Sequence, residues 1–358
     1  MSTVSIVITI IILAGFLLFT SCKHFSGAVN KELSDSYYYN RNKSAIQYSP
    51  MGNWFELGNT KMDADVASFE VLGRDYGKDM HKIYFKASDI SNEVDYATFW
   101  VKEHFAFDQN HVYVAIEYLP YELVENVPSS KKLLIIEGAN PQSFVNINND
   151  WSKDDKLYFY NYQAVEVDYA SFEILNETCS KDKNTVYLHH KDGIIASDID
   201  VVSVQVIDKH YVADRDRLYS FERWEEDSEK AMTIIPLLDA RTIEVLEHGY
   251  LLVDDGVYYN NVRMPMAHRA SFKIWKDTYY GVDKNYVYYC EMPIEGADQE
   301  SFHVFAYQSY AKDKNNAYYV GKPMKGVDVE SFGPKDKNGS GLFKDKNHIY
   351  RGDEIVRE

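Results

Sequence analysis

Residues 281–305, GVDKNYVYYCEMPIEGADQESFHVF, are followed by a close copy of themselves, AKDKNNAYYVGKPMKGVDVESF, at residues 311–332. Both stretches carry an Asp-Lys-Asn triplet, a tyrosine pair soon after it, and a Ser-Phe pair. An Asp at the start of a turn can bond its side chain to the backbone two residues on, and Asn tolerates the left-handed backbone of a tight turn. The segments around the triplet are therefore predicted to be two antiparallel strands, with a further short strand at Ser-Phe.

The Ser-Phe pair, or a conservative variant of it, recurs along the chain at intervals near thirty residues. Self-similarity at a fixed period is the sequence signature of a repeat protein. Two longer intervals hold insertions, near residues 115–136 and 220–238. The second members of the nine pairs are Phe69, Phe99, Phe144, Phe172, Val204, Ile243, Phe272, Phe302 and Phe332.

Each repeat also has an aspartate that opens the turn and a tyrosine soon after it. Seven turn aspartates have a tyrosine five positions later: Asp79, Asp108, Asp182, Asp214, Asp283, Asp313 and Asp345. In two further repeats, Asp154 and Asp254 precede a tyrosine by four positions. We call the resulting set the tyrosine ladder: Tyr84, Tyr113, Tyr158, Tyr187, Tyr219, Tyr258, Tyr288, Tyr318 and Tyr350. These rings either pack between hairpins or form a face that binds a sugar or a peptide.

These spacings predict an all-β protein made of tandem hairpin repeats of about thirty residues, with about three short strands in each. An open, curved, solenoid-like array is the preferred arrangement, and a β-propeller is the alternative. Residues 67–358 would hold about nine repeats, and residues 37–66 would form a divergent first repeat or cap.

The N-terminal segment has a composition of its own. Residues 4–19 are an uncharged and largely apolar run, too short for a typical spanning helix and typical of a secretory signal. The four residues from Phe19 to Cys22 resemble a bacterial lipobox, which predicts acylation of Cys22 after cleavage. Residues 1–22 are therefore interpreted as a signal peptide with a lipobox-like end, or alternatively as a retained N-terminal anchor, and residues 23–36 as a tether. The expected location is the bacterial cell envelope, on the periplasmic side or the cell surface, with a lipid anchor in the membrane.

Composition excludes some partners and supports the strand prediction. A formal net charge of −17 disfavours binding to phosphate backbones, so no nucleic-acid partner is expected. The 30 tyrosines favour strands. Besides Cys22, only Cys179 and Cys290 are present, too few for a disulfide framework.

The segments VDKNYVYY (282–289), AKDKNNAYY (311–319) and KDKNTVYL (181–188) resemble the repeats of the DKNYY family of bacterial exported and lipid-anchored proteins. The resemblance covers the chain from about Tyr37 to the C-terminus. It implies a repeat fold and export, and it implies no activity and no catalytic residues. The chain departs from the pattern at Arg215-Asp216 and Asp255-Gly256, which replace Lys-Asn and leave the turn geometry there open.

No catalytic or metal-ligating pattern stands out in the chain. There is no serine in a Gly-flanked elbow, no zinc-type spacing of Cys and His, and no calcium-loop spacing of acids. Acidic pairs such as Asp154-Asp155 and Asp214/Asp216 are interpreted as solvated turn carboxylates rather than as cation ligands. We therefore expect no cofactor, no metal and no catalytic residues.

These observations predict a non-catalytic protein of the cell envelope that acts in binding or scaffolding. Its partner would be a protein or a glycan. The alternative is an envelope hydrolase whose site is formed by the two insertions, because insertions in repeat proteins map to loops that often lie on a binding face.

Overall fold

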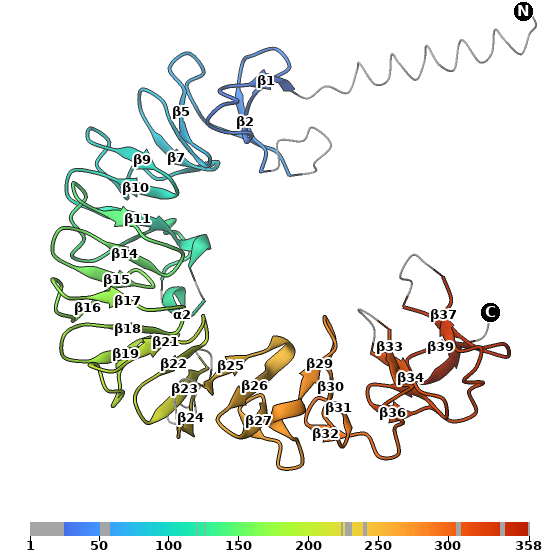
Figure 1. Cartoon of the computed structure of the whole chain (residues 1–358). Coiled ribbons are helices and arrows are strands. Elements are labelled where there is room, and N and C mark those ends of the chain that lie inside the picture. The colour runs from blue at the N-terminus through green and yellow to red at the C-terminus, as the bar shows by residue number, and fades with distance from the viewer. Residues whose placement is uncertain are drawn as a thin grey trace, which may run out of the picture. The chain divides into compact units, whose positions relative to one another are not determined.

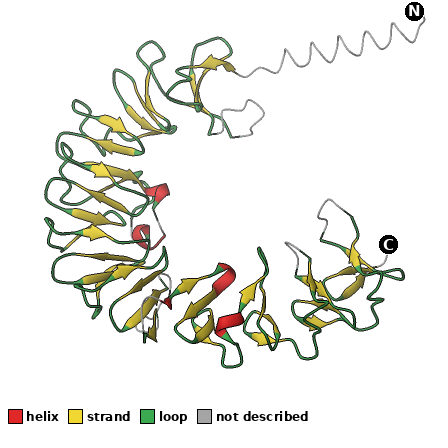
Figure 2. Ribbon diagram, viewed as in Figure 1, coloured by secondary structure: helices red, strands yellow, loops and turns green. Residues whose placement is uncertain are grey.

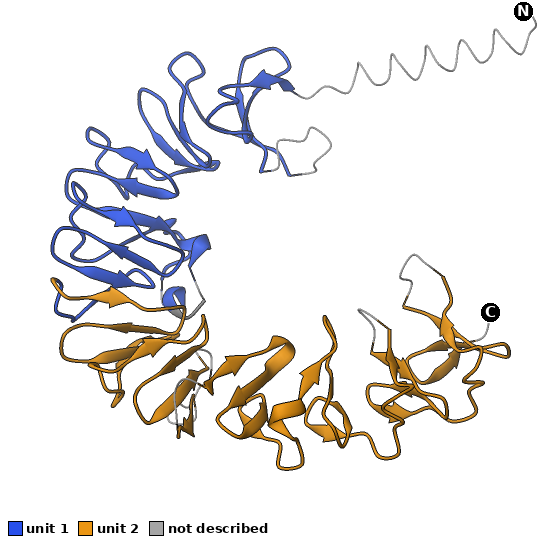
Figure 3. Cartoon of the chain, in the orientation of Figure 1, with its two compact units in different colours: residues 1–169 blue, residues 170–358 orange. Residues whose placement is uncertain are grey.

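The computed structural model describes residues 25–50, 58–119, 121–125, 127–222, 225, 231–238, 242–305, 309–336 and 341–356. The chain divides into two compact units, unit 1 (Met1–Tyr169) and unit 2 (Ala170–Glu358), which Figure 3 shows in different colours. The predicted signal peptide and Cys22 lie outside the described residues.

Both units are built from small antiparallel sheets (Figure 1). Each sheet has four strands that pair in chain order, so each is a simple meander and none of the described sheets closes on itself. Strands and turns make up nearly all of the described chain, and its helices are short (Figure 2). The prediction of an all-β fold with tandem repeats is confirmed. We number the sheets 1 to 10 along the chain.

Unit 1 contains sheets 1 to 4. Sheet 1 consists of β1 (Phe25–Ala28), β2 (Tyr37–Asn40), β3 (Ile46–Tyr48) and β4 (Thr60–Lys61). Sheet 2 consists of β5 (Glu70–Gly73), β6 (Tyr76–Lys78), β7 (Ile83–Phe85) and β8 (Ser88–Asp89). Sheet 3 consists of β9 (Trp100–Lys102), β10 (Phe105–Phe107), β11 (Val112–Ala115) and β12 (Leu133–Ile135). Sheet 4 consists of β13 (Val145–Asn146), β14 (Trp151–Lys153), β15 (Tyr158–Tyr160) and β16 (Gln163–Val165).

Unit 2 contains sheets 5 to 10. Sheet 5 consists of β17 (Glu173–Ile174), β18 (Cys179–Lys181), β19 (Val186–His190) and β20 (Gly193–Ala196). Sheet 6 consists of β21 (Gln205–Val206), β22 (Tyr211–Ala213), β23 (Arg217–Phe221) and β24 (Met232–Pro236). Sheet 7 consists of β25 (Glu244–Val245), β26 (Tyr250–Val253), β27 (Gly256–Tyr259) and β28 (Val262–Arg263). Sheet 8 consists of β29 (Lys273–Ile274), β30 (Tyr280–Val282), β31 (Val287–Tyr289) and β32 (Met292–Pro293). Sheet 9 consists of β33 (His303–Val304), β34 (Tyr310–Lys312), β35 (Ala317–Tyr319) and β36 (Lys322–Pro323), and sheet 10 of β37 (Gly333–Pro334), β38 (Phe343–Lys344), β39 (Ile349–Arg351) and β40 (Glu354–Val356).

One sequence repeat forms one sheet. The second member of each Ser-Phe type pair lies directly before the first strand of sheets 2 to 10. The number of strands in a repeat differs from the prediction, because the sheets have four strands and not about three. The unpredicted strand is the fourth, which in sheets 8 and 9 is a two-residue edge strand that ends in proline. Proline is tolerated there because an edge strand has one side without a hydrogen-bonding neighbour.

The first sheet begins earlier than the sequence indicated. Strand β1 pairs with β2 and thereby belongs to sheet 1, although its residues lie within the predicted tether, 23–36. The tether prediction is wrong for residues 25–28, which have no repeat motif and so could not be recognised as a strand.

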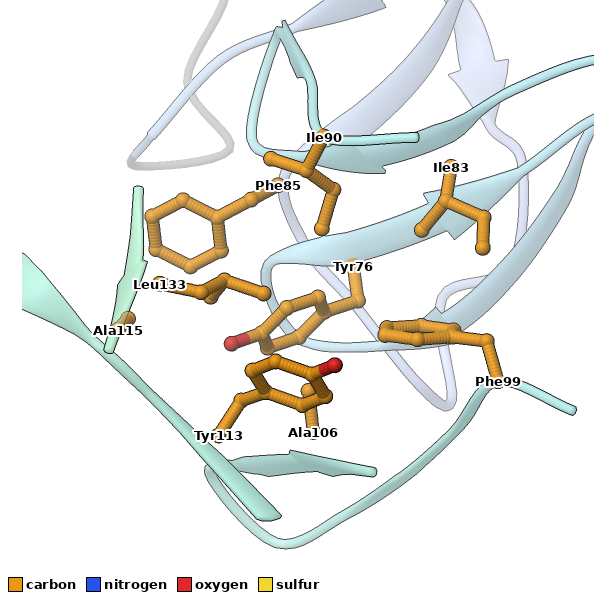
Figure 4. Packing of buried hydrophobic residues seen from close by; sticks show 9 residues of the cluster. All are labelled: Tyr76, Ile83, Phe85, Ile90, Phe99, Ala106, Tyr113, Ala115 and Leu133. Atoms are coloured by element: carbon orange, nitrogen blue, oxygen red, sulfur yellow. The ribbon is translucent and has the colours of Figure 1, made fainter. Parts of the chain in front are cut away.

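Successive sheets within a unit pack face to face around aromatic side chains. Phe302 lies 5.3 Å from the ladder tyrosine Tyr318 of its own sheet and 5.8 Å from Tyr280 of the sheet before, measured between ring centroids. Figure 4 shows the corresponding cluster between sheets 2 and 3, in which Phe99 lies near Tyr76 and Tyr113. Burying one such phenylalanine contributes about 1.5–3 kcal/mol to folding. The phenylalanine of the repeat motif therefore connects its own sheet with the sheet before it.

The size of the second residue of the Ser-Phe type pair is related to the size of one residue in the second strand, the one that pairs with the ladder tyrosine. Gly281 pairs with Tyr288, and a Cβ atom on Gly281 would lie 2.6 Å from Cζ of Phe272. In five sheets whose motif residue is Phe, the position opposite the ladder tyrosine is small: Gly77, Ala106, Ser180, Gly281 and Ala311. In sheet 4 the small Ser152 lies opposite Phe159, and sheet 10 is an exception, because Phe343 lies opposite Tyr350. Where the motif residue is Val204 or Ile243, the position is filled by Val212 or Leu251. The space between sheets is thus filled to a similar extent in both cases.

Tyrosine hydroxyls also join consecutive sheets. Tyr280 donates its hydroxyl proton to the backbone carbonyl of Ser309 in the next connection, at 2.9 Å, and Tyr310 does the same to Gly352 at 2.8 Å. The hydroxyl oxygen of Tyr250 lies 2.8 Å from the carbonyl oxygens of both Tyr279 and Cys290, so its one proton can be donated to either. These bonds satisfy a buried polar group while the ring fills the core, which explains why the chain uses so many tyrosines.

The helices are confined to connections. The insertion of sheet 3 contains the 3₁₀ helix η1 (Ile116–Tyr118) and the single turn α2 (Tyr121–Val124). Two further 3₁₀ helices, η3 (Glu247–Gly249) and η4 (Arg269–Ser271), lie in sheet 7 and in the connection to sheet 8. In the described part of the chain, no helix has the length and apolar character needed to cross a membrane. Cys179 and Cys290 are both free thiols.

Candidate functional site

The meander places the connections of every sheet at the two opposite ends of its strands, and the word edge refers to these ends in the two names that follow. The turn between the second and third strands, which carries the aspartate, lies at one edge, which we call the DKN edge. The connections between strands one and two and between strands three and four lie at the opposite edge, which we call the far edge. Both sequence insertions fall between strands three and four, and so at the far edge of sheets 3 and 6.

At the DKN edge, the turn aspartate accepts four hydrogen bonds. Oδ1 of Asp313 accepts the backbone N–H groups of Asn315 and Asn316, both at 2.7 Å. Its Oδ2 accepts the hydroxyl of Tyr318 and the backbone N–H of Asp298, both at 2.8 Å. The same four bonds are made by Asp79, Asp108, Asp214, Asp283 and Asp345. Asp182 accepts the two turn amides and the hydroxyl of Tyr187.

The serine of the repeat motif closes this arrangement. Ser301 donates its hydroxyl proton to Oδ1 of Asp298 at 2.7 Å and accepts the backbone N–H of Lys314 at 2.9 Å. The backbone N–H of Asp298 also donates to Asp313. The connection before the sheet is therefore joined to the turn within the sheet by two hydrogen bonds, one from Asp298 to Asp313 and one from Lys314 to Ser301. Residues equivalent to Asp298, such as Asp65 and Asp328, were not predicted to take part.

The hydrogen bonds determine the charge of these buried groups. Burial raises the pKa of the Asp345 carboxyl, but bonds from the backbone amides of Asp328 and Asn347 and the hydroxyl of Tyr350 outweigh burial and bring its pKa to about 2. The pKa values of Asp79, Asp108, Asp214, Asp283 and Asp313 lie below the ordinary value for the same reason. Burial, together with the bond to Asp345, raises the pKa of Tyr350 to about 12. The aspartate is therefore ionised and the tyrosine neutral across the physiological pH range.

Two repeats depart from the arrangement. In sheet 4 the buried ring is Phe159, which lies 5.9 Å from Phe144, the same distance that separates Phe272 from Tyr288 in sheet 8. The assignment of Tyr158 to the ladder is therefore wrong: it is half-buried, and the position five residues after Asp154 is Phe159. In sheet 7, Asp254 has a left-handed backbone (φ 50°) in a two-residue turn, so Tyr258 lies four positions later and is half-buried. The Arg215-Asp216 variant, by contrast, keeps the turn, because the bonds to Asp214 involve only backbone groups there.

Three expectations about the DKN edge need correction. Eight of the nine turn aspartates are buried rather than solvated, and Asp254 is half-buried; Asp214, for example, is 3% exposed. Among described residues with positive φ, none is an asparagine of an Asp-Lys-Asn turn, so the left-handed role given to Asn is wrong. The ladder members Tyr84, Tyr113, Tyr219, Tyr288, Tyr318 and Tyr350 are buried, and Tyr187 is half-buried, so they pack between sheets and form no open binding face. No group of three or more potential metal ligands occurs in the described parts of the chain.

The far edge, in contrast, varies from sheet to sheet and contains a cavity. The cavity has a volume of ≈ 420 Å³ and lies in unit 1 over sheets 2 to 4. Seven of the described residues that line it come from five far-edge connections, and Tyr76 is the first residue of β6: Arg74, Asp75, Tyr76, Glu103, His104, Tyr118, Asn149 and Tyr162. Cavities of this volume with convergent polar groups are typical of small-molecule sites.

Asp75 is the most constrained polar group of this cavity. It is 8% exposed, and its two carboxylate oxygens accept the hydroxyls of Tyr48 at 2.7 Å and Tyr118 at 2.6 Å. Tyr118 belongs to η1 of the insertion, so Asp75 of sheet 2 anchors the insertion of sheet 3. Burial, with the bond to Asp75, raises the pKa of Tyr118, and burial lowers the pKa of His104, so neither side chain carries a charge at neutral pH.

Two further contacts hold the insertion on sheet 2. Glu117 of η1 forms an ion pair with Lys86 in the turn after β7. Where the insertion returns to β12, Glu93 accepts the backbone N–H groups of Lys132 and Leu133, both at 3.1 Å. The insertion is thus fixed at both ends, and Tyr118 has a defined position at the cavity.

Tyr162 has an unusual backbone for its residue type. It lies in the two-residue turn between β15 and β16, with φ of 64°. The equivalent positions in sheets 7 and 9 are Asn261 (φ 66°) and Gly321 (φ 75°), which tolerate this conformation well. Strained positions of this kind occur frequently at functional sites. An aromatic ring has therefore been placed at the cavity where local backbone preference favours a small or polar residue.

We expect Tyr162→Asn to leave the free energy of unfolding within about 1 kcal/mol of the wild type, because relief of the left-handed backbone offsets the lost contact with Phe105. Thermal and denaturant unfolding of both proteins measure this. A loss above about 2 kcal/mol would mean that the ring is retained for packing and not for a ligand.

The comparison with known families agrees with the repeat geometry. The model of the DKNYY family matches residues 92–223 and 228–354, which together are more than half of the chain. The chain belongs to the DKNYY family. Each matched stretch contains four of the turn aspartates: Asp108, Asp154, Asp182 and Asp214 in the first, and Asp254, Asp283, Asp313 and Asp345 in the second. No curated protein and no solved structure matches the chain.

The DKNYY motif therefore describes the DKN edge, and it leaves the far edge undefined. Asp and Tyr of the motif are bonded to each other inside the sheet, as Asp313 and Tyr318 show. The cavity residues Asp75, Tyr118 and Tyr162 lie outside the motif, and sequence reasoning missed them. The insertion near residues 115–136 was the only sequence signal that pointed to this part of the DKNYY repeat array.

Proposed function

We propose that this DKNYY protein is a non-catalytic binding protein of the bacterial cell envelope, anchored through Cys22, and that the cavity of unit 1 is its binding site. The observation that carries the proposal is the cavity itself. It lies at the edge that the structural motif leaves free, and an insertion docked by Asp75, Lys86 and Glu93 supplies one of its walls. A scaffold with one constant edge and one variable edge is an arrangement suited to binding.

The position of Asp75 supports binding over hydrolysis. A catalytic carboxylate must approach the reacting bond and exchange a proton with it. Both oxygens of Asp75 instead accept tyrosine hydroxyls at 2.6–2.7 Å, which fixes the carboxylate against the protein. Glu103 is the second carboxylate at the cavity and lies on an exposed turn. We therefore place a hydrolase, the alternative indicated by the insertions, second.

The binding site is tested by extracting the full chain from its membrane and identifying small molecules that copurify, by native mass spectrometry. We expect a bound molecule in the wild type and its loss in Tyr118→Ala and Tyr162→Asn. Tyr279→Ala is the matched control, because Tyr279 is a 45% exposed tyrosine of unit 2. A molecule held equally by all four proteins would contradict the cavity as the site, and a cleaved molecule would support the hydrolase.

The anchor is tested separately. We expect Cys22→Ala to abolish membrane association, because acyl chains attached to this cysteine would be the only attachment of the mature chain. Fractionation of cells followed by mass spectrometry of the mature N-terminus measures both the location and the modification. A variant that stays in the membrane and retains Met1 would show that residues 1–22 are a spanning anchor.

A further inference from the structure

We propose that the ligand of the unit 1 cavity is a neutral saccharide of one or two rings. This inference rests on the proposed function, since it names the class of molecule that the cavity binds. Three properties of the described lining carry it: the absence of aliphatic side chains, the mixture of hydrogen-bond donors and acceptors, and the aromatic rings at the wall.

The lining disfavours purely apolar ligands. Every described residue that lines the cavity has a hydrogen-bonding group in its side chain. A hydrocarbon ligand would remove those of these groups that still contact water without replacing their hydrogen bonds, which costs about 1–3 kcal/mol for each such group. A lipid tail or a similar molecule is therefore unsuited to this cavity.

The charges disfavour polyanions. Asp75 and Glu103 contribute two carboxylates, whereas Arg74 contributes the one guanidinium among the described lining residues. Burial lowers the pKa of His104, which leaves it neutral. A phosphate would meet a net negative wall within a chain whose formal charge is −17.

The polar groups match the chemistry of sugar hydroxyls. Each hydroxyl of a sugar both donates and accepts, so it can pair with an acceptor, a donor or a mixed group. Asp75 and Glu103 are acceptors, Arg74 is a donor, and Asn149 offers both.

The aromatic groups match the faces of sugar rings. Tyr118 is 41% exposed and Tyr162 is half-buried, so both retain ring surface that a ligand can contact. Both are held by aromatic neighbours: Tyr118 lies edge-on to Phe85 at 6.3 Å, and Tyr162 lies edge-on to Phe105 at 6.1 Å. Rings fixed in this way present an apolar face with a polar tip, which suits the C–H faces and hydroxyl rims of a saccharide.

A buried hydroxyl at the wall provides a second, independent indication of a polar ligand. Tyr76 is 2% exposed, and its hydroxyl has no hydrogen-bond partner within the described structure. Other buried tyrosines in the same sequence position, such as Tyr280 and Tyr310, donate to a backbone carbonyl of the next sheet. Buried polar groups without partners are rare and are found at functional sites. Tyr76 is the member of this series that lines the cavity.

The class of ligand is tested by titrating the full chain with an array of neutral mono- and disaccharides, with dipeptides and adenosine as the competing classes. Binding is followed by saturation-transfer NMR and calorimetry. We expect at least one saccharide to bind with a Kd below about 1 mM, and we expect Tyr118→Ala and Tyr162→Asn to weaken it at least tenfold. Tyr279→Ala is expected to bind as the wild type does.

The other outcomes separate this inference from the proposed function. If a dipeptide or adenosine binds in the cavity and no saccharide binds, the inference that the ligand is a saccharide is wrong, and the proposed binding function remains. Saccharide binding that Tyr118→Ala and Tyr162→Asn leave unchanged would overturn the site. If no compound of any class binds and nothing copurifies with the chain, both the inference and the proposed function are wrong.

Discussion

Replacing Asp313 with alanine is expected to lower the free energy of unfolding by about 3–5 kcal/mol. The carboxylate accepts hydrogen bonds from two turn amides, from the amide of Asp298 and from the hydroxyl of Tyr318. Alanine leaves these four donors without their acceptor, in a place where Asp313 is only 3% exposed. Each unsatisfied buried group costs about 1–3 kcal/mol, and partial hydration of the turn reduces the total.

Two variants make this measurement specific. Asp313→Asn keeps an oxygen for the turn amides of Asn315 and Asn316 but replaces Oδ2 by an N–H₂ group, so we expect about half of the loss. Asp255→Asn alters a turn carboxylate whose side chain is 79% exposed, and we expect a change below about 0.5 kcal/mol. Because sheets of a repeat protein can unfold separately, hydrogen exchange of the sheet 9 amides should accompany denaturant unfolding. A loss below about 1 kcal/mol for Asp313→Ala would show that the bonds are dispensable.

Lowering the pH is expected to destabilise the protein over a narrow range of pH. Six turn aspartates have folded-state pKa values below the ordinary value, and that of Asp345 is about 2. A carboxyl whose pKa is lower in the folded state stabilises the fold above its unfolded pKa, near 3.9, and this stabilisation is lost as the pH falls toward the folded pKa. We therefore expect constant stability from pH 7 to about pH 5, and a loss of several kcal/mol between about pH 4 and pH 2.

Denaturant unfolding at a series of pH values checks this expectation. Each pKa unit corresponds to about 1.4 kcal/mol, and the six groups contribute together, so the slope between pH 4 and pH 2 should be steep. Asp313→Asn removes one of the titrating groups and should make the slope shallower. Stability that already declines between pH 7 and pH 5 would point to histidines and not to the turn aspartates.

The sequence predicted the repeating part of the structure because that part depends on local chemistry. The Asp-to-Tyr spacing places both side chains at one edge of the sheet, and Asp313 and Tyr318 indeed form a bond there. The Ser-Phe pair marks the start of each sheet because Ser301 bonds the turn and Phe302 fills the space to the preceding sheet. The two-residue fourth strands were missed because a pair such as Met292–Pro293 has no periodicity.

The burial of the turn aspartates could not be predicted from their residue type. Aspartate in a turn is commonly solvated, and only the folded chain brings the amide of Asp298 to the carboxylate of Asp313, fifteen residues later. The substitution of Phe159 for the ladder tyrosine was hidden by Tyr158 beside it. The cavity was missed because Asp75, Tyr118 and Tyr162 come from three connections that have no common spacing in the sequence.

The bonds of the turn aspartates have a consequence for how the chain folds. They join residues that are at most 17 positions apart, and every strand pairs with its neighbour in the sequence. All-β proteins usually fold slowly because their strands pair over long distances, whereas this chain has a low contact order. Each sheet can form as soon as its own thirty residues are present. Its exposed face is then available for the next sheet to pack against. A chain that folds from its N-terminus can therefore add one sheet at a time, so that only one incomplete sheet is exposed at any stage.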